Sequence, residues 1–134
     1  GGPSVDGSAP LARPEREPDR TASVALLPQQ AAIYRLCGDR NPIHVDPAAA
    51  GRAGYEQPLM HGLCTYGVVC KAVVDGALDG DPAALRSYRG KFTSHVFPGE
   101  HLEISLWSDG DQVTAEAVTR ERGLTVFVAT AMTA

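Results

Sequence analysis

The feature that most constrains the fold is one long helical pattern followed by a change of period. Between His61 and Leu78, apolar residues recur at spacings of three and four, which places them on one side of a helix. The apolar stripe is broad, so we expect this helix to be buried over most of its surface. From Leu85 onward the apolar period changes to two, which is typical of strands with one buried face.

The second half of the chain predicts four antiparallel strands. Apolar residues alternate with polar ones around Tyr88–Val96, Leu102–Leu106 and Val113–Ala117, and 124–132 is apolar on both faces, as in a central strand. Pro98-Gly99, Asp109-Gly110-Asp111 and Arg122-Gly123 supply the turns, and the last two predict hairpins. A short β-prone run at 21–27 adds a further strand before the helical part.

A sheet of this size has one apolar face to cover, and the 61–78 helix is the element able to cover it. We therefore predict an α+β protein with a curved antiparallel sheet wrapped around one long central helix, the hot-dog arrangement. An uncovered face or edge of that sheet favours pairing with a second copy.

Between the first strand and the long helix, the sequence predicts a helical insertion. Pro28 suits the first turn of a helix over 29–36, and Pro47–Ala53 is a second short helix. The segment between them, 37–44, has no period, and Pro42 prevents it from continuing a helix. Residues 1–20 hold four of the ten prolines and few apolar residues, so we expect a linker or tail there and a single domain over 21–134.

Composition excludes several classes of protein. The chain has 134 residues, a formal charge of −4 and a pI near 5.5, which argues against a nucleic-acid binder. No apolar run reaches the roughly 18–20 residues that a membrane span needs. Three cysteines are too few for a disulfide scaffold, so we expect reduced thiols and a cytoplasmic protein without a membrane partner.

The strongest candidates for chemistry are Asp39, Asn41 and His44, which lie within six positions of the irregular segment. The bend at Pro42 can bring His44 back toward the carboxylate, and a carboxylate with an imidazole can divide acid and base work on one water molecule. The alternative is that Asp and Asn only bond the local backbone, as they commonly do in turns. Gly62 is a further candidate, because an unpaired N–H at the start of the long helix can bind a developing oxyanion; the alternative is a glycine needed for close packing.

Other residue sets carry weaker signals. Cys37, His44, Asp46 and His61 could ligate a metal, but no pair has a zinc-type spacing, and no phosphate-binding glycine motif is present. We therefore expect no metal and no nucleotide cofactor. Cys37 could be a nucleophile beside His44, although a buried thiol is the simpler interpretation. Arg89 and Lys91 share one strand face and could bind a phosphate of a substrate, or they could form a solvated sheet face.

The run Tyr34 to His44, YRLCGDRNPIH, resembles the signature of the MaoC-like dehydratases, also called hydratase 2 or (R)-specific enoyl-CoA hydratases. Two further stretches look like the same family, PLMHGLCTYG at 58–67 and FT through VFPGE at 92–100, and the resemblance extends from Thr21 to the C-terminus. Cys37 departs from the signature in a position for a small residue that is often Ser.

The resemblance implies a hot-dog fold and reversible hydration of trans-2-enoyl-CoA to (3R)-hydroxyacyl-CoA. It implies that Asp39 and His44 activate the water, that Asn41 orients the site and that the Gly62 N–H binds the thioester oxygen. It also implies that the acyl-CoA substrate is handled without a metal or redox cofactor. The chain looks like the second half of a double hot-dog protein, so we expect a homodimer or pairing with an N-terminal hot-dog unit. A non-catalytic half that binds acyl-CoA, or a hot-dog thioesterase, remains as an alternative.

Overall fold

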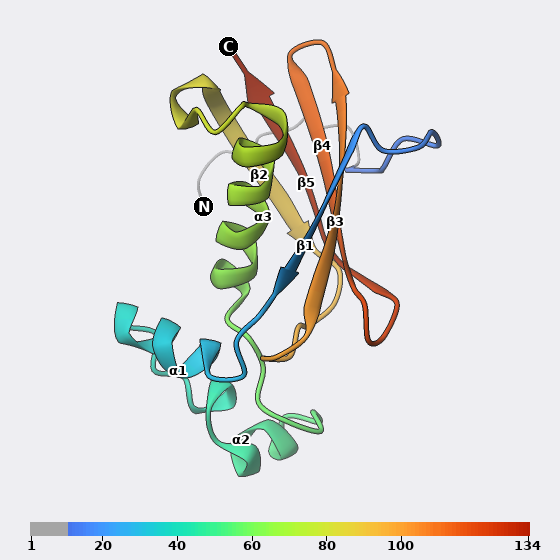
Figure 1. Cartoon of the computed structure of the whole chain (residues 1–134). Coiled ribbons are helices and arrows are strands. Elements are labelled where there is room, and N and C mark those ends of the chain that lie inside the picture. The colour runs from blue at the N-terminus through green and yellow to red at the C-terminus, as the bar shows by residue number, and fades with distance from the viewer. Residues whose placement is uncertain (1–10) are drawn as a thin grey trace, which may run out of the picture.

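A five-stranded antiparallel sheet curves around one long helix in the computed structural model, which describes residues 11–134 (Figure 1). The helix α3 spans Gly62–Ala77. The strands are β1 (Arg20–Ala25), β2 (Leu85–Phe92), β3 (His101–Asp109), β4 (Gln112–Thr119) and β5 (Leu124–Thr133), in the spatial order β1-β3-β4-β5-β2. The predicted α+β hot-dog fold is confirmed.

The core lies between α3 and the concave face of the sheet. Val69 and Val73 of α3 are fully buried against apolar side chains of the inner strands, among them Ile104 and Phe127. Phe127 also needs a glycine on its neighbouring strand, because a Cβ at Gly90 would lie 2.0 Å from its Cζ. The helix can therefore sit close to the sheet only with these particular small and large residues in register.

The strands and turns follow the sequence pattern with one exception, at the end of β2. β5, apolar on both faces, lies between β4 and β2, and the two predicted hairpins turn at Gly110 and Gly123, both with positive φ. The prediction that the first of the four strands continues to Val96 is wrong, because β2 ends at Phe92. The N–H groups of Thr93 and Ser94 both donate to the Val126 carbonyl, which takes the chain out of the strand register.

The segment between β1 and α3 consists of short helical pieces at the N-terminal end of α3 (Figure 1). These pieces are α1 (Gln30–Tyr34), the 3-10 turns η1 (Arg35–Cys37) and η2 (Pro42–His44), and α2 (Pro47–Arg52). Two of them are capped at the N-terminus by a side chain: Asn41 Oδ1 accepts the Ile43 N–H at η2, and Asp46 Oδ1 accepts the Ala48 N–H at α2. A third turn, η3 (Pro82–Ala84), leads into β2.

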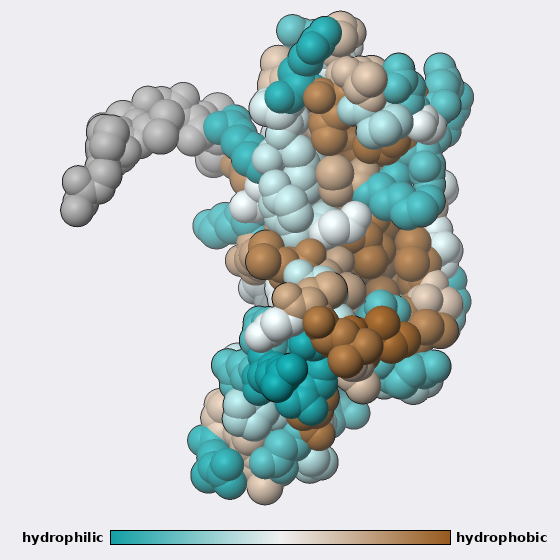
Figure 2. All heavy atoms as spheres, turned by 90° about the vertical axis from the view of Figure 1, so that its left-hand side faces the viewer, coloured by the Kyte–Doolittle hydropathy of each residue, from teal (hydrophilic) through white to brown (hydrophobic). Residues whose placement is uncertain are grey.

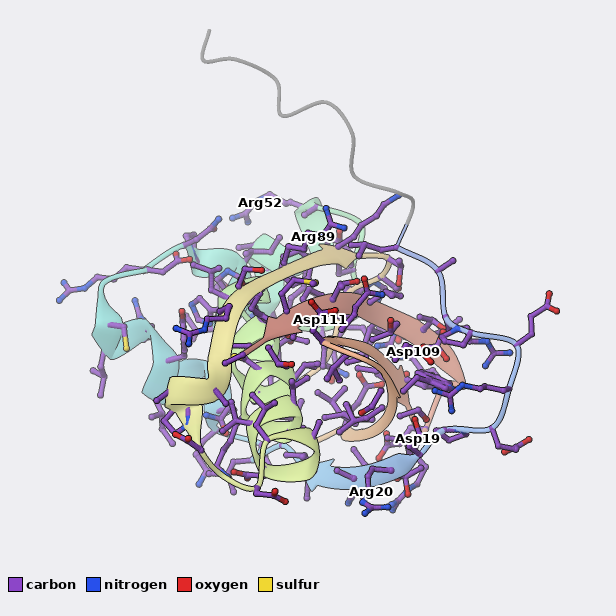
Figure 3. The ribbon with its side chains drawn as sticks, turned by 90° about the horizontal axis from the view of Figure 1, so that it is seen from above. Asp19, Arg20, Arg52, Arg89, Asp109 and Asp111 are labelled. Carbon is purple, nitrogen blue, oxygen red and sulfur yellow. The ribbon has the colours of Figure 1, made fainter. Side chains whose placement is uncertain are left out.

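The chain before β1 lies along β3. Trp107 Nε1 donates to the Arg16 carbonyl over 2.8 Å, and the Arg16 guanidinium pairs with Asp19 and Asp109, whose side chains lie on the same side of the sheet (Figure 3). The end of the predicted linker is thus held to the domain, whereas residues 1–10 lie outside the described residues. Within 11–134, no helix is both long and apolar enough to cross a membrane.

Candidate active site

The loop between η1 and η2 is built by its own side chains. Gly38 adopts φ 114°, a conformation that L side chains rarely adopt, and so lets the chain reverse after η1. Asp39 Oδ1 then accepts the Asn41 N–H over 3.2 Å, and Asn41 begins η2. Asp39 and Asn41 therefore have the local turn roles that the sequence left open. The Asp39 side chain is nevertheless exposed, and its second oxygen has no hydrogen bond within residues 11–134.

His44 is held in one tautomer by the segment before α3. Its Nδ1 lies 2.8 Å from the Leu59 carbonyl oxygen, and the Leu59 N–H donates to the Ile43 carbonyl over 3.2 Å. A carbonyl can only accept a hydrogen bond, so Nδ1 carries the proton. The Nε2 of the neutral ring consequently has a free lone pair and can act as a base.

His61 also belongs to this site, although the sequence pattern did not predict a catalytic role for it. It is 1% exposed, its ring stacks on that of His44 with 3.7 Å between centroids, and its Nε2 donates to the Asp39 carbonyl over 3.2 Å. Burial lowers the pKa of His61, so the ring is held neutral. Its Nδ1 is buried without a hydrogen-bond partner among the described residues. The one sign of this role in the sequence was the position of His61, directly before Gly62 at the start of the predicted helix.

Among residues 11–134, Asp39, His44 and His61 form the group that could hold a cation. Each offers a ligand atom, and these atoms lie within 4.8 Å of one another. One nitrogen of each imidazole is already engaged by a backbone carbonyl, which leaves one nitrogen per ring. Cys37 is exposed and Asp46 caps α2, so neither joins the cluster. The expectation of a site without a metal stays a prediction.

Gly62 opens α3, directly after His61. Its N–H belongs to the first helical turn and makes no hydrogen bond within the described chain. A Cβ at this position would lie 3.3 Å from Phe92 Cζ, so glycine lets the β2 ring pack closely against the helix start. Both the close-packing role and a free N–H are therefore present. Gly62 also lines a pocket of about 520 Å³, which we call the Gly62 pocket.

Arg89 and Lys91 are not brought to this site. Along β2 they alternate with Tyr88, Gly90 and Phe92, and these last residues face α3 and Phe127. In the view from above, Arg89 lies on the side of β2 that points away from α3 (Figure 3). A role for this pair in binding a substrate phosphate stays a prediction.

The arrangement combines two proton acceptors with one hydrogen-bond donor. A carboxylate oxygen of Asp39 and a ring nitrogen of His44 lie within 4.8 Å of each other, a separation that one water molecule can bridge. The Gly62 N–H, one residue beyond His61, stands at the positive end of the α3 dipole and can bind an oxygen that gains negative charge. These are the parts needed to add water to, or remove it from, a carbon–carbon double bond conjugated to a carbonyl group.

Comparison with known proteins gives matches over almost the whole chain. The MaoC-like domain model matches residues 10–129. The chain is 50% identical over 109 residues to enoyl-CoA hydratase ChsH3 of Mycobacterium tuberculosis, covering 81% of this chain and 38% of that protein. It is 41% identical over 125 residues to peroxisomal enoyl-CoA hydratase 2 of Arabidopsis thaliana, covering 93% of this chain and 40% of that protein.

A solved structure agrees with the sequence comparison. Full-length peroxisomal multifunctional enzyme type 2 from Drosophila melanogaster superposes with a TM-score of 0.91 and 37% identity, covering 97% of this chain and 25% of that one. The chain therefore spans about two fifths or less of the length of these relatives.

Proposed function

Because the chain belongs to the MaoC-like domain family, we propose that it catalyses the reversible hydration of trans-2-enoyl-CoA to (3R)-hydroxyacyl-CoA. The observation that carries the proposal is the tautomer of His44. Its Nδ1–H is committed to the Leu59 carbonyl, so Nε2 is left free to act as a base, in a ring that shares one cluster with the Asp39 carboxylate. Relatives named as enoyl-CoA hydratases support the reaction class.

In the proposed reaction, a water molecule is held between Asp39 and His44 Nε2. The water oxygen attacks the β-carbon of the enoyl group, and the Asp39–His44 pair acts as the base that accepts the proton lost by the water. A proton is then delivered to the α-carbon, so that one hydroxyl and one hydrogen have been added across the double bond. The reverse sequence removes water from the hydroxyacyl thioester.

The negative charge of the intermediate gathers on the thioester oxygen. We assign the Gly62 N–H as its donor, because it is free and stands at the N-terminal end of a 16-residue helix. Asn41 helps to position Asp39 and His44, because its backbone and side-chain hydrogen bonds fix the turn that carries both residues. No step needs a metal or a redox cofactor, because the double bond is only hydrated.

The test is a hydration assay with crotonyl-CoA, which follows the loss of absorbance of the conjugated thioester. We expect turnover by the unmodified chain and a loss of about 10²–10⁴-fold in Asp39→Ala and in His44→Ala. A coupled (R)-specific or (S)-specific dehydrogenase identifies the product, and a thiol reagent detects any released CoA. Unchanged turnover in both variants, an (S) product or thiol release would contradict the assignment.

We also propose that the chain works paired with a second hot-dog unit. Large hydrophobic side chains remain exposed on α1, η1, α3 and β2, namely Ile33, Leu36, Leu63 and Phe92, with Leu36 83% exposed. Figure 2 shows hydrophobic surface gathered across the middle of the face that includes α1 and α3. The adjoining strand β2 is an edge of the sheet, which leaves backbone groups free to extend it. The greater length of the relatives supports a second unit.

Light scattering of the purified chain tests this pairing. We expect a homodimer when no other unit is supplied, and we expect Leu63→Asp to shift it toward the monomer. Leu124→Asp is the matched control, because Leu124 is an exposed leucine at the start of β5. A monomer that turns over crotonyl-CoA at full rate would contradict the pairing, whereas a chain that is inactive until an N-terminal unit is added would identify a complementing half.

A further inference from the structure

One ion pair lies outside the candidate active site and is largely buried on both sides. Glu100 is the residue before β3, and Arg122 lies in the turn between β4 and β5. Their side chains are 8% and 20% exposed, whereas every other ion pair within residues 11–134 has at least one side chain that is 37% exposed or more. Taking two charges out of water costs free energy, so a buried pair often adds little net stability. Stability alone therefore explains this pair poorly.

The ion pair fixes the backbone on both sides of Val96. The Arg122 guanidinium donates to both oxygens of Glu100, over 2.5 Å and 2.8 Å, and to the His95 carbonyl over 2.7 Å. Glu100 Oε2 in turn accepts the Phe97 N–H over 2.8 Å. The side chains of these two neighbours also contact Arg122, because His95 Nε2 accepts from its Nη1 over 3.1 Å and the Phe97 ring centroid lies 4.7 Å from its Cζ. Val96, 4% exposed, thus lies between two residues that the same ion pair holds.

The Val96 carbonyl connects this loop to the segment before α3. It accepts the Met60 N–H over 2.8 Å, and both residues are buried. Within residues 11–134, this is the hydrogen bond that joins residues 59–61 to the part of the chain that follows α3. The position of Met60 therefore depends on that of Val96.

The residues on either side of Met60 hold the catalytic cluster. The Leu59 carbonyl oxygen lies 2.8 Å from His44 Nδ1 and keeps the proton on that nitrogen. His61 stacks on the His44 ring and donates to the Asp39 carbonyl. Planar peptide bonds join Met60 to both neighbours, so a shift of Met60 would move both of these contacts.

The loop that carries Asp39 and His44 has few buried contacts that could replace this support. Residues 36–42 are all exposed, and the helical pieces around them are three to six residues long. A segment with few buried contacts opens readily unless its neighbours hold it. Leu59 is the neighbour that binds the His44 ring, so its position determines where the free Nε2 of His44 points.

We propose that Glu100 and Arg122 are positioning residues of the active site. By fixing the loop at residues 95–97, the ion pair keeps the Leu59 carbonyl on His44 Nδ1 and leaves Nε2 free to act as a base. The inference rests on the proposed function, since it takes His44 as a base of the hydration. Neither residue of the pair belongs to the catalytic cluster, so the pair acts through the orientation of His44.

Arg122→Lys tests the geometry of the pair while keeping its charge. A lysine ammonium can neutralise Glu100, but it cannot bind both Glu100 oxygens and donate to His95 in one rigid arrangement. We expect kcat for crotonyl-CoA to fall by about 10- to 100-fold with KM little changed, because a misplaced base slows the chemical step. Arg120→Lys is the matched control, since Arg120 lies in the same turn and pairs with a glutamate, the exposed Glu103. It should leave kcat unchanged.

The tautomer of His44 gives a readout that a purely structural role would not change. Long-range ¹H–¹⁵N spectra of the chain with ¹⁵N-labelled histidine show which ring nitrogen carries the proton, and His44→Ala assigns the signal. The spectra are recorded at pH 8.5, about two units above the ordinary histidine pKa of 6.5. We expect the Nδ1–H tautomer in the unmodified chain and in Arg120→Lys. In Arg122→Lys we expect a mixture of both tautomers, because the ring then lacks a fixed acceptor.

A double variant, Glu100→Gln with Arg122→Met, removes the pair without leaving one buried charge alone. The glutamine oxygen can still accept the Phe97 N–H, whereas the bond to the His95 carbonyl is lost. We expect a folded chain, with an unchanged circular dichroism spectrum, that has a lower kcat and a mixture of His44 tautomers. An unchanged kcat or an unchanged tautomer in either folded variant would overturn the inference and leave the pair with a structural role only.

The tautomer also separates this inference from the proposed function, because it is measured without a substrate. A chain that hydrates no enoyl-CoA, but in which Arg122→Lys mixes the His44 tautomers and Arg120→Lys does not, would refute the proposed reaction and support the positioning role. A chain that hydrates crotonyl-CoA at the same rate and with the same tautomer in all of these variants would do the opposite.

Discussion

The segment before α3 and the sheet after it are held together in different ways. In β3, β4 and β5, neighbouring strands pair along almost their whole length, with one register shift at Ala117/Val118, and bury one apolar face against α3. Between β1 and α3, the pieces are short, and side chains such as Asp39, Asn41 and Asp46 supply bonds that the backbone lacks. All of the proposed catalytic residues lie in this second region or at its junction with α3.

The difference shows how this domain divides stability from chemistry. The inner strands have their backbone groups paired within the ladder and their apolar side chains packed, and the buried Thr119 Oγ1 is the sheet atom without a partner among the described residues, so the sheet offers few groups that could react. The segment before α3 keeps an exposed carboxylate, a free imidazole nitrogen and a buried nitrogen without a partner. We expect changes in this segment to alter activity more than stability, and changes in the sheet to do the reverse.

The largest expected effect is on activity. Asp39→Asn keeps an oxygen that can accept the Asn41 N–H, so the turn is preserved, but the side chain can no longer accept a proton. Crotonyl-CoA hydration should fall by about 10²–10⁴-fold, while the midpoint of thermal unfolding hardly changes. Asp81→Asn is the control, because Asp81 caps η3 in the same way and is remote from the site. A large loss of stability in Asp39→Asn would show that Asp39 serves mainly to hold the turn.

Phe127→Ala should have the largest effect on stability. The ring is fully buried and packs against Phe92 and Tyr66, so its removal leaves a cavity that should lower the free energy of unfolding by about 3–5 kcal/mol. Urea unfolding followed by circular dichroism measures the change. Residual turnover per folded molecule should stay close to that of the unmodified chain, and a selective loss of turnover would break the proposed division.

His61 connects the two regions, and its effect should depend on pH. Burial lowers its folded pKa below the value of 6.5 that it has when unfolded, so the unfolded chain takes up the proton more readily. The stabilisation is complete above pH 6.5 and is lost as the pH falls through the folded pKa. Unfolding midpoints between pH 5.5 and 7.5 should therefore decline toward acid less steeply in His61→Phe than in the unmodified chain. Parallel curves for the two proteins would exclude His61 as the cause.

The smallest effect on stability is expected for the exposed pair of His101, at the start of β3, and Glu121, in the turn between β4 and β5. His101 Nδ1 lies 2.6 Å from Glu121 Oε1, and the hydrogen bonds from His101 lower the pKa of Glu121 to about 2. Both side chains are more than one third exposed, so water and salt weaken the pair. Glu121→Gln should shift the unfolding midpoint only slightly, and the shift should vanish in 1 M NaCl, where the screening length is about 3 Å. A shift that resists salt would mean that this pair is part of the stable sheet.

The sequence allowed most of the fold to be predicted, for a reason that lies in its periods. The three-and-four spacing over 61–78 and the two-residue spacing after Leu85 are local signals, and one long helix can cover one antiparallel sheet in few ways. The exception is instructive. In the sequence, the alternation of β2 continues to Val96. In the structure, the Val126 carbonyl accepts the N–H groups of two successive residues, 93 and 94, and the strand ends at Phe92.

The site was determined by the sequence only as a set of candidates. Asp39, Asn41 and His44 are close in the chain, so a single loop had to bring them together, and the structure places Asp39 and His44 in one cluster. The part of His61 was decided by the tertiary structure, because stacking on His44 and bonding to the Asp39 carbonyl join residues 17 and 22 positions apart in the chain. The tautomer of His44 was likewise settled by a partner distant in the chain, Leu59, since a ring nitrogen takes its proton according to the group that faces it.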